Sequence, residues 1–235
     1  MLTKSSMAFI SGWGLKSSLF KESSLYFRGS LLIDLPDIEE LTLERVVHNL
    51  SYLIPDDTTV IGWSFGGLIG ILLAALFPKK VKKLILLSSS PRFIQRGRWP
   101  GISLAEANKF INLAKRSFSN LFNYFLALVN YPNRTVYYKR LLINNSINFS
   151  EYHDLLLKYL KILFESDVRE AYKRIKIPLF HVFGEQDPII QLNPKALYNL
   201  NPSAVIHVIP ESGHLAFLIH EKSYYNQLTN FINHA

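Results

Sequence analysis

The chain has 235 residues, of which 49% are hydrophobic and 19% charged, and its formal net charge is +8. This composition indicates a globular protein with a substantial core and excludes a disordered chain. The sequence has no cysteine, which excludes disulfides and thiolate metal sites, and no apolar run reaches the roughly 18–20 residues of a membrane span.

Strand and helix patterns alternate over the first ninety residues. Helical periodicity marks two segments, 41–54 and 66–78, each followed or closed by a proline. Strands separated by helices predict a parallel sheet with right-handed crossovers. The strands are expected in four short apolar segments: 7–14, 29–37, 58–63 and 81–91.

The segment 92–176 has a different character, because it is helix-forming, aromatic and basic. Residues 91–176 hold 15 Lys and Arg against 6 Asp and Glu, whereas the rest of the chain holds 11 against 12. The excess charge is either a set of solvated helix faces or a docking surface for an acidic partner. No nucleic-acid-binding motif is present, so nucleic acid is not expected as that partner. The sequence predicts a helical lid, 92–176, inserted over one end of the sheet.

The alternation returns in the last sixty residues. Strands are predicted at 177–187 and in the first part of 204–214, and helices at 193–202 and 221–234. The chain is therefore expected to be an α/β protein whose core comprises 1–91 and 177–235. Its opening residues lack the features of a signal peptide, so we expect a cytoplasmic protein.

Ser64 lies in the sequence GWSFG, residues 62–66, which matches the pattern G-x-S-x-G. A strand is predicted before it and a helix after it, and in that context the serine occupies a sharp turn that exposes its hydroxyl at the end of the strand. Ser64 is therefore the candidate nucleophile.

A serine hydroxyl needs a base and an acid to be reactive, and in this fold they follow in the order serine, acid, histidine. His214, in the glycine-containing loop PESGHLAF, is the candidate base. Asp187, directly after a predicted strand, is the candidate acid, with Glu185 as a less favoured alternative. The remaining histidines after Ser64 are interpreted as structural, surface or lid residues: His153, His181, His207, His220 and His234.

An oxyanion formed on the substrate would need two backbone donors. One is expected from the amide of Phe65, the residue after the nucleophile. The other is expected from the loop 11–14, most simply from the amide of Trp13. The Trp13 side chain is expected to pack in the core, to line an acyl pocket, or to do both.

At this point the chain resembles an α/β-hydrolase and, more narrowly, the pimeloyl-[acyl-carrier protein] methyl ester esterases of biotin synthesis. The triad motifs indicate only the superfamily, whereas the run of motifs in the middle of the chain is more specific to the esterases. The motifs that carry the resemblance are GWG (12–14), DLP (34–36), GWSFGG (62–67), LLSSSPRF (86–93), WPGI (99–102), FLAL (125–128), GEQD (184–187) and GH (213–214).

The resemblance implies a Ser64–Asp187–His214 triad, no metal or organic cofactor, and an acyl-carrier protein as partner of a monomeric enzyme. It implies that the substrate is bound by Trp13, Ser64, Phe65, Phe125, Leu126, Ala127, Leu128, Val129 and His214. The carrier would dock on basic lid residues, for which the candidates are Lys115, Arg116, Arg134, Lys139 and Arg140.

The sequence also departs from the family pattern. Ser11 replaces the usual histidine before the oxyanion loop, Asp37 replaces a glycine, and Val129 replaces a polar residue. The opening strands of the family have no counterpart in this sequence. Three alternatives to the carrier-specific esterase remain: a broad short-chain carboxylesterase, a hydrolase of C–C bonds or thioesters, and a non-catalytic binding module.

Overall fold

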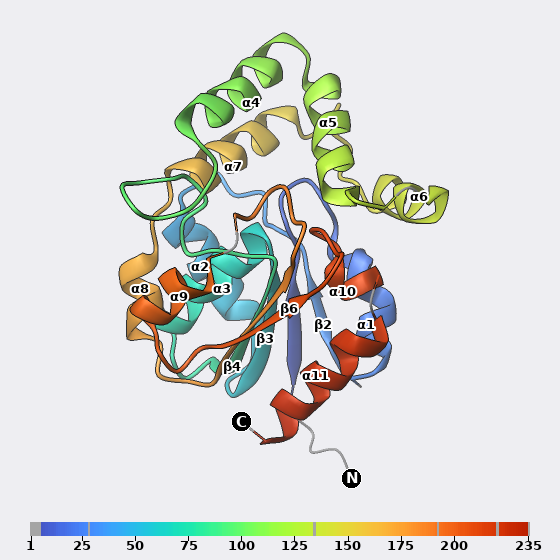
Figure 1. Ribbon diagram of the computed structural model, residues 1–235. Helices are drawn as coiled ribbons and strands as arrows, with labels where there is room; N and C mark the ends of the chain where they lie inside the picture. The colour runs from blue at the N-terminus through green and yellow to red at the C-terminus, as the bar shows by residue number, and fades with distance from the viewer. Residues whose placement is uncertain (1–5, 28, 134, 192, 220, 235) are drawn as a thin grey trace.

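The computed structural model describes residues 6–27, 29–133, 135–191, 193–219 and 221–234. Within them, a sheet of six parallel strands runs in the order β2-β1-β3-β4-β5-β6 (Figure 1). The strands are β1 (Met7–Ile10), β2 (Leu31–Ile33), β3 (Thr58–Trp63), β4 (Val81–Leu87), β5 (Leu179–Gly184) and β6 (Val205–Ile209). The predicted α/β fold with a parallel sheet is confirmed.

Helices cover both faces of this sheet. In Figure 1, α2, α3, α8 and α9 lie on one side, and α1, α10 and α11 lie on the other. The helices of the core are α1 (Lys21–Leu25), α2 (Leu43–Leu53), α3 (Phe65–Leu76), α8 (Arg169–Arg174), α9 (Pro194–Leu200), α10 (Ala216–Ile219) and α11 (Glu221–His234). A 3₁₀ turn, η1 (Ser17–Phe20), precedes α1, and neither η1, α1 nor α10 was predicted.

The predicted strands are longer than the observed ones. Strand β1 ends at Ile10 and β4 at Leu87, whereas the sequence predicted strands to residues 14 and 91. Apolar and small residues continue past both ends, but there the backbone turns into the loops above the sheet. These loops carry the candidate functional residues, as expected for a parallel α/β sheet, in which functional residues gather at the carboxyl ends of the strands.

Helices α2 and α3 differ in their surfaces. Helix α2 buries one face through Val46, Val47 and Leu50, and Thr42 caps it by accepting a hydrogen bond from the Arg45 amide at 3.2 Å. Helix α3 is apolar all round and is buried from Phe65 to Ala74, because the sheet, α2 and α8 all pack against it. The helix that begins at the candidate nucleophile is therefore held rigidly in the core.

The segment 92–176 forms α4 (Leu104–Arg116), α5 (Phe118–Asn130), α6 (Val136–Asn144), α7 (His153–Glu165) and the core helix α8. Helices α4, α5 and α7 lie beyond one end of the strands, and α6 projects to the side (Figure 1). Helix α8 packs against α3. The division of the chain into a core and an inserted lid stays a prediction, and the packing of α8 favours a lid that ends before Arg169.

His181 is buried in the middle of β5, as expected for a structural histidine. Its Nε2 lies 2.9 Å from the Tyr172 hydroxyl of α8, and its ring stacks on Phe183 with centroids 5.3 Å apart. Burial without a charged partner lowers the pKa of His181 from 6.5 to about 3, because desolvation disfavours the imidazolium. The folded protein therefore holds this ring in its neutral form.

The neutral His181 should make the free energy of unfolding depend on pH. A histidine whose pKa is lower in the folded state is protonated first in the unfolded chain, so stability is lost as the pH falls below about 6.5. Between pH 7 and pH 5 this residue should cost about 2 kcal/mol. Urea titrations of wild type and His181→Gln at both pH values test this, because the variant should lose correspondingly less. An equal loss in both proteins would contradict the prediction.

Candidate active site

Ser64 lies between β3 and α3 in a strained backbone conformation, with φ 54° and ψ −118°. A positive φ is uncommon for serine and persists only where the surroundings impose it. Here the Ser64 amide donates to the Leu87 carbonyl at 2.9 Å, and the Ser89 hydroxyl donates to the Ser64 carbonyl at 2.6 Å. The end of β4 therefore holds the turn in place, and the Ser64 residue is only 6% exposed.

The glycines around Ser64 allow backbones to approach each other closely. A Cβ atom at Gly62 would clash with the backbone of Gly66 and Gly67, and one at Gly66 would clash with the carbonyl oxygens of Ile10 and Ser11. Side chains at these positions would push β3, α3 and the end of β1 apart. The spacing G-x-S-x-G thus reflects tight packing as well as the turn itself.

Asp187 and His214 meet above the end of β5. His214 Nδ1 lies 2.7 Å from Asp187 Oδ2, and the two side chains are 0% and 1% exposed. The other oxygen, Asp187 Oδ1, accepts hydrogen bonds from the amides of Ile189 at 2.8 Å and Ile190 at 3.1 Å. The carboxylate is therefore oriented by its own loop, with one oxygen directed at the imidazole.

The loop that carries His214 lies beside the serine turn. The Trp63 indole N–H donates to the His214 carbonyl at 3.1 Å, and the centroids of the two rings are 5.3 Å apart. His214 Nε2 is buried and has no hydrogen-bond partner among the described residues. The Nδ1 atom of His214 thus faces a carboxylate, and its Nε2 remains unpaired next to the serine turn. An imidazole in this arrangement can accept a proton.

The alternative acid, Glu185, lies at the surface. Its Oε2 accepts a hydrogen bond from the Glu211 amide at 3.3 Å, and the residue is exposed. His153 is also away from the pair, because its Nδ1 lies 3.1 Å from the exposed carboxylate of Asp154. These contacts favour Asp187 and His214 over the other candidates.

The two proposed oxyanion donors lie close to the serine. Phe65 is the first residue of α3, so its amide points out of the positive end of that helix. The loop from Ser11 to Trp13 also contacts Ser64, because a Cβ atom at Gly12 would lie 3.3 Å from the Ser64 Cβ. Within the described part of the chain, neither the Phe65 amide nor the Trp13 amide donates a hydrogen bond to another protein group.

The side chains of the loop are firmly anchored. The Trp13 indole N–H donates to the Leu156 carbonyl of α7 at 2.8 Å, and its ring packs edge-on against Phe125 of α5 at 4.8 Å. Ser11, where the resemblance to the esterases predicts a histidine, is fully buried, and its hydroxyl donates to the Leu15 carbonyl at 2.6 Å. This hydrogen bond therefore connects the two ends of the loop from Ser11 to Leu15.

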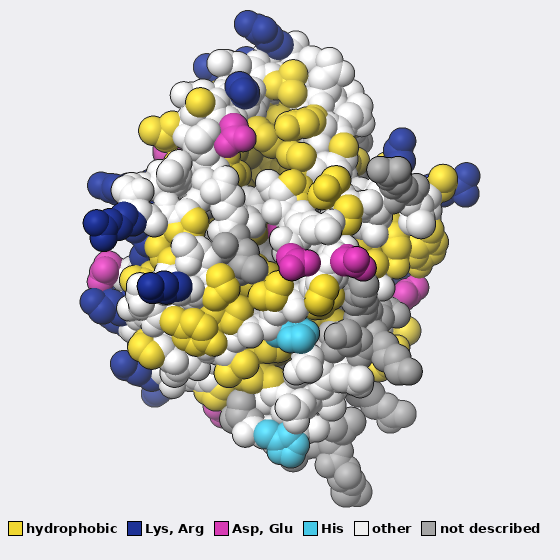
Figure 2. Space-filling view, viewed as in Figure 1, with side chains coloured by type: hydrophobic (Ala, Val, Ile, Leu, Met, Phe, Trp, Pro, Cys, Tyr) yellow, Lys and Arg dark blue, Asp and Glu magenta, His cyan; other side chains and the backbone are white. Residues whose placement is uncertain are grey.

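A cavity of about 280 Å³ opens above Ser64 between the sheet and the helices beyond it. Figure 2 shows hydrophobic side chains gathered around a hollow in the upper half of the face that it displays. Such an apolar cavity with few polar groups is typical of a site for a small acyl chain. The lining residues are Trp13, Ser64, Phe93, Ile102, Glu106, Lys109, Phe110, Leu113, Tyr124, Phe125, Leu128, Leu160, Leu163, Phe164, Pro188, Ile189 and Gln191.

The predicted substrate contacts divide into two groups. Trp13, Ser64, Phe125 and Leu128 line the cavity. The others do not line it: Phe65 and Val129 are buried, Leu126 is half-buried, Ala127 is exposed, and His214 is buried beside Asp187. The other lining residues of α4, α5 and α7 lie on helix faces that the sequence showed only as helical periodicity, so sequence analysis did not single them out.

The basic residues suggested for docking lie on two helices. Lys115 and Arg116 are exposed in the last turn of α4, and Lys139 and Arg140 are exposed on α6. Arg134 lies outside the described residues. Lys109 of α4, which sequence analysis did not single out, lines the cavity itself.

The described residues contain neither a candidate metal site nor a candidate membrane span. No group of three or more histidine, aspartate or glutamate side chains could hold a metal ion there. Nor does any helix in those ranges have the length and apolar character needed to cross a membrane.

Comparison with known proteins identifies the family and the fold. A family model described as alpha/beta hydrolase fold matches residues 37–221. Pimeloyl-[acyl-carrier protein] methyl ester esterase from Wigglesworthia glossinidia brevipalpis is 32% identical, covering 91% of this chain and 88% of the relative. The protein of the same name from Chromobacterium violaceum is 30% identical, covering 96% and 93%.

Solved structures share the fold at low sequence identity. The esterase EaEST from Exiguobacterium antarcticum has a TM-score of 0.83 at 17% identity and covers 97% of this chain and 92% of that one. MenH from S. aureus has a TM-score of 0.75 at 18% identity, covering 99% and 95%. From its sheet, its serine turn and these matches, the chain belongs to the α/β-hydrolase fold family, as the sequence motifs predicted.

Proposed function

We propose that this chain is a serine carboxylesterase that hydrolyses the methyl ester of pimeloyl-[acyl-carrier protein] to the free acid and methanol, as a step in biotin synthesis. The observation that carries the proposal is the buried Asp187–His214 pair beside the Ser64 turn, at the base of an apolar cavity. The relatives that match nine-tenths of the chain bear the name of this activity. We further propose that the enzyme is cytoplasmic and monomeric.

The first half of the reaction acylates Ser64. His214 Nε2 takes the hydroxyl proton while the Ser64 oxygen forms a bond to the ester carbonyl carbon. The negative charge that develops on the carbonyl oxygen is stabilised by the amides of Phe65 and Trp13 and by the positive end of α3. When the intermediate collapses, the bond to the methoxy oxygen breaks, and His214 gives its proton to the leaving group, so that methanol departs.

The second half releases the acid. A water molecule gives a proton to His214 Nε2 while its oxygen attacks the acyl-serine carbon, and the bond to Ser64 then breaks as the serine regains a proton. Asp187 stabilises the imidazolium in both halves through its contact with Nδ1. Each step moves only protons and electron pairs among Ser64, His214, the ester and water, so the proposed reaction has no step for a metal or an organic cofactor to perform.

The shape of the cavity supports an acyl substrate of this kind. Its base contains Ser64, and its walls are mainly aromatic and aliphatic side chains such as Phe110, Leu160 and Phe164, which suit a chain of methylene groups. Its lining also includes the charged Glu106 and Lys109 and the polar Tyr124 and Gln191. The helices that form its walls belong to the basic segment, whose charge would attract an acidic carrier protein.

Mass spectrometry of a carrier-bound methyl ester tests the proposal directly. Incubation with the enzyme should lower the mass of the acylated carrier by the difference between a methyl ester and an acid, with methanol as the second product. Hydrolysis of free short-chain esters with no conversion of the carrier-bound ester would instead establish the broad carboxylesterase. Loss of the whole acyl chain from the carrier would identify a thioesterase.

The ionic strength should affect the carrier-bound substrate far more than a free ester. Attraction between the basic helices and an acidic carrier acts at long range, and the Debye length falls from about 10 Å at 0.1 M salt to about 3 Å at 1 M. We expect kcat/KM for the carrier-bound ester to fall at least about tenfold over this range, mainly through the association rate. The value for a small neutral ester should change by less than about twofold, since it needs no long-range attraction.

Charge reversal separates this effect from general salt effects. Changing Lys115, Arg116, Lys139 and Arg140 together to Glu should reproduce the high-salt result at low salt. The matched control reverses four exposed lysines of the core, Lys21, Lys79, Lys82 and Lys195, and should have a much smaller effect. An equal salt response for both substrates, with no selective loss in the first variant, would remove the carrier from the proposal and leave a general esterase.

A further inference from the structure

Trp63, the residue before the candidate nucleophile, forms a hydrogen bond with the backbone of the candidate base. Its indole N–H donates to the carbonyl of His214 at 3.1 Å, although the two residues are 151 positions apart in the chain. From this contact we infer that Trp63 is a positioning residue, which sets the distance between the Ser64 turn and the His214 backbone. The inference rests on the proposed function, in which His214 is the base that serves Ser64.

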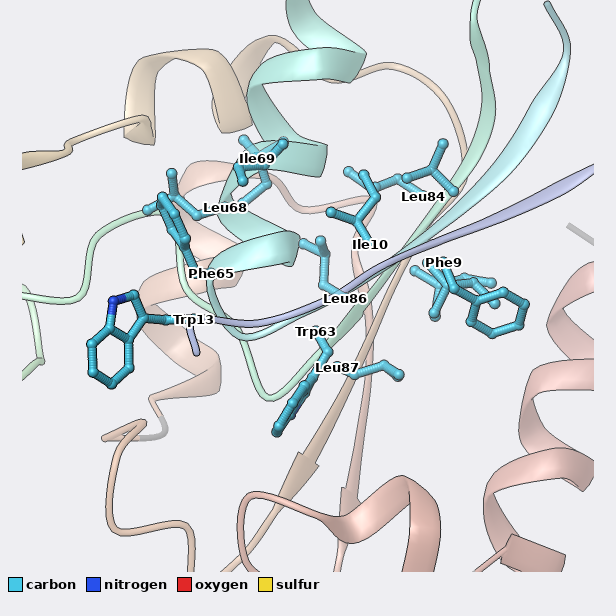
Figure 3. Packing of buried hydrophobic residues seen from close by; sticks show 14 of the residues in the cluster. Phe9, Ile10, Trp13, Trp63, Phe65, Leu68, Ile69, Leu84, Leu86 and Leu87 are labelled. Atoms are coloured by element: carbon cyan, nitrogen blue, oxygen red, sulfur yellow. The ribbon is translucent and has the colours of Figure 1, made fainter. Parts of the chain in front are cut away.

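The Trp63 ring cannot easily move, because it is buried and enclosed by other rings. It lies 5.6 Å from Phe217 of α10 and 6.4 Å, edge-on, from Phe20 of η1, and it is 1% exposed. In Figure 3 the Trp63 side chain points away from those of Trp13 and Phe65, on the other side of the backbone at the end of β3. Trp63 is not among the residues that line the cavity, and its hydrogen bond and its contact with Phe217 both involve the segment that carries His214.

Trp63 and Asp187 constrain different parts of His214. The Asp187 carboxylate contacts the ring at Nδ1 and so selects the tautomer and the rotation of the imidazole. The Trp63 indole holds the main-chain carbonyl of His214, and so fixes the position of the backbone from which the imidazole extends. Gly213, the preceding residue, offers no side chain to anchor the loop, although its backbone packs tightly on the Tyr131 carbonyl.

A small displacement of His214 would lower kcat/KM by different factors for different esters. In acylation His214 first accepts the Ser64 proton and then gives a proton to the leaving oxygen, and both transfers need close geometry. Methoxide is a poor leaving group and needs that second transfer. The p-nitrophenolate ion is stable in water and departs without a proton, so a p-nitrophenyl ester depends on only the first transfer.

The experiment compares kcat/KM for methyl hexanoate and p-nitrophenyl hexanoate in wild type and Trp63→Phe. This substitution keeps an aromatic ring and removes the N–H donor. We expect kcat/KM to fall about 30-fold for the methyl ester and only about fivefold for the p-nitrophenyl ester. Replacing Trp63 by 3-benzothienylalanine, which has the shape of tryptophan but a sulfur atom in place of the N–H, should give the same inequality with less loss of packing.

Phe217→Leu is the matched control. It removes a buried ring whose centroid lies 5.6 Å from that of Trp63, but the phenylalanine side chain has no donor for a hydrogen bond to His214. Its cost in stability should therefore resemble that of Trp63→Phe, while its losses on the two esters should be equal. Equal losses on both esters in the Trp63 variants as well would overturn the inference and leave Trp63 as a packing residue.

A measurement without turnover separates this inference from the proposed function. The proton that bridges His214 Nδ1 and Asp187 should give a far-downfield proton NMR signal in the wild type. In Trp63→Phe this signal should exchange with water faster, because the loop is released, while Phe217→Leu should leave it unchanged. An unchanged signal in the Trp63 variants contradicts the inference, whatever ester the enzyme prefers. Conversely, a faster exchange with no activity on the carrier-bound ester would contradict only the proposed substrate.

Discussion

Replacement of Ser64 by alanine should abolish ester hydrolysis while the protein stays folded. In the proposed mechanism the Ser64 oxygen forms the covalent bond to the acyl group, and no neighbouring hydroxyl can replace it, because the Ser89 hydroxyl is already donated to the Ser64 carbonyl. Loss of a serine nucleophile costs about 10⁶ in kcat in a related mechanism, so the residual rate should lie at the limit of detection. The substitution deletes one oxygen at a residue that is 6% exposed, so thermal unfolding should change little.

The measurement is kcat on a methyl ester and on a p-nitrophenyl ester, with far-UV circular dichroism to check the fold. Ser90→Ala is the matched control, because its hydroxyl donates to the Arg92 carbonyl near the same end of the sheet and has no part in the mechanism. Activity of Ser64→Ala within about tenfold of wild type would rule out the assignment.

A covalent serine probe extends this test to the non-catalytic alternative. A fluorophosphonate should add its mass to the peptide that contains Ser64 in wild type and not in Ser64→Ala, because only an activated serine reacts. A wild-type chain that takes up no probe would favour a binding module on a hydrolase fold.

Asp187→Asn should lower kcat by about 10³–10⁴, because it should change which nitrogen of His214 carries the proton. Asp187 Oδ1 accepts two backbone hydrogen bonds, from Ile189 and Ile190. An asparagine would keep its carbonyl oxygen there and turn its NH₂ group toward His214. The imidazole would then present an unprotonated Nδ1 to that group and carry its proton on Nε2, where it could no longer accept the proton of Ser64.

Glu185→Gln is the control for this prediction. Glu185 is exposed and accepts a hydrogen bond from the Glu211 amide, so its replacement should change kcat by less than about threefold. Steady-state kinetics of both variants on the same ester decide between the carboxylates. A kcat that is almost unchanged in Asp187→Asn but strongly reduced in Glu185→Gln would identify Glu185 as the acid.

Much of the fold and of the candidate site follows from local patterns in the sequence. The GWSFG turn is recognisable because all its requirements are met within a few residues: a buried strand, glycines that permit close packing, and an apolar helix. Asp187 and His214 could be selected because each follows a strand in the expected chain order. The parallel sheet followed from the alternation of strands and helices.

Other features were not predictable, because they depend on which residues meet across the fold. The strand predictions overran at β1 and β4, where mostly small and buried residues, 11–14 and 88–91, carry the chain into the loops. The point at which a strand stops pairing depends on its neighbours in the sheet. The wall of the cavity comes from α4, α5 and α7, and periodicity cannot tell whether an apolar face of a helix meets the core or lines a cavity.

The sequence by itself determined the fold class, the position of the serine turn, and the candidate acid and base, because these depend on neighbours along the chain. Only the tertiary structure decided the contacts between distant segments. It brought the Trp63 indole to the His214 carbonyl, turned the second oxygen of Asp187 toward the imidazole, and buried Val129 while leaving Phe125 and Leu128 on the cavity. The physical reason is that the direction of a side chain is set by how whole helices and strands pack against one another, and no short stretch of sequence contains that information.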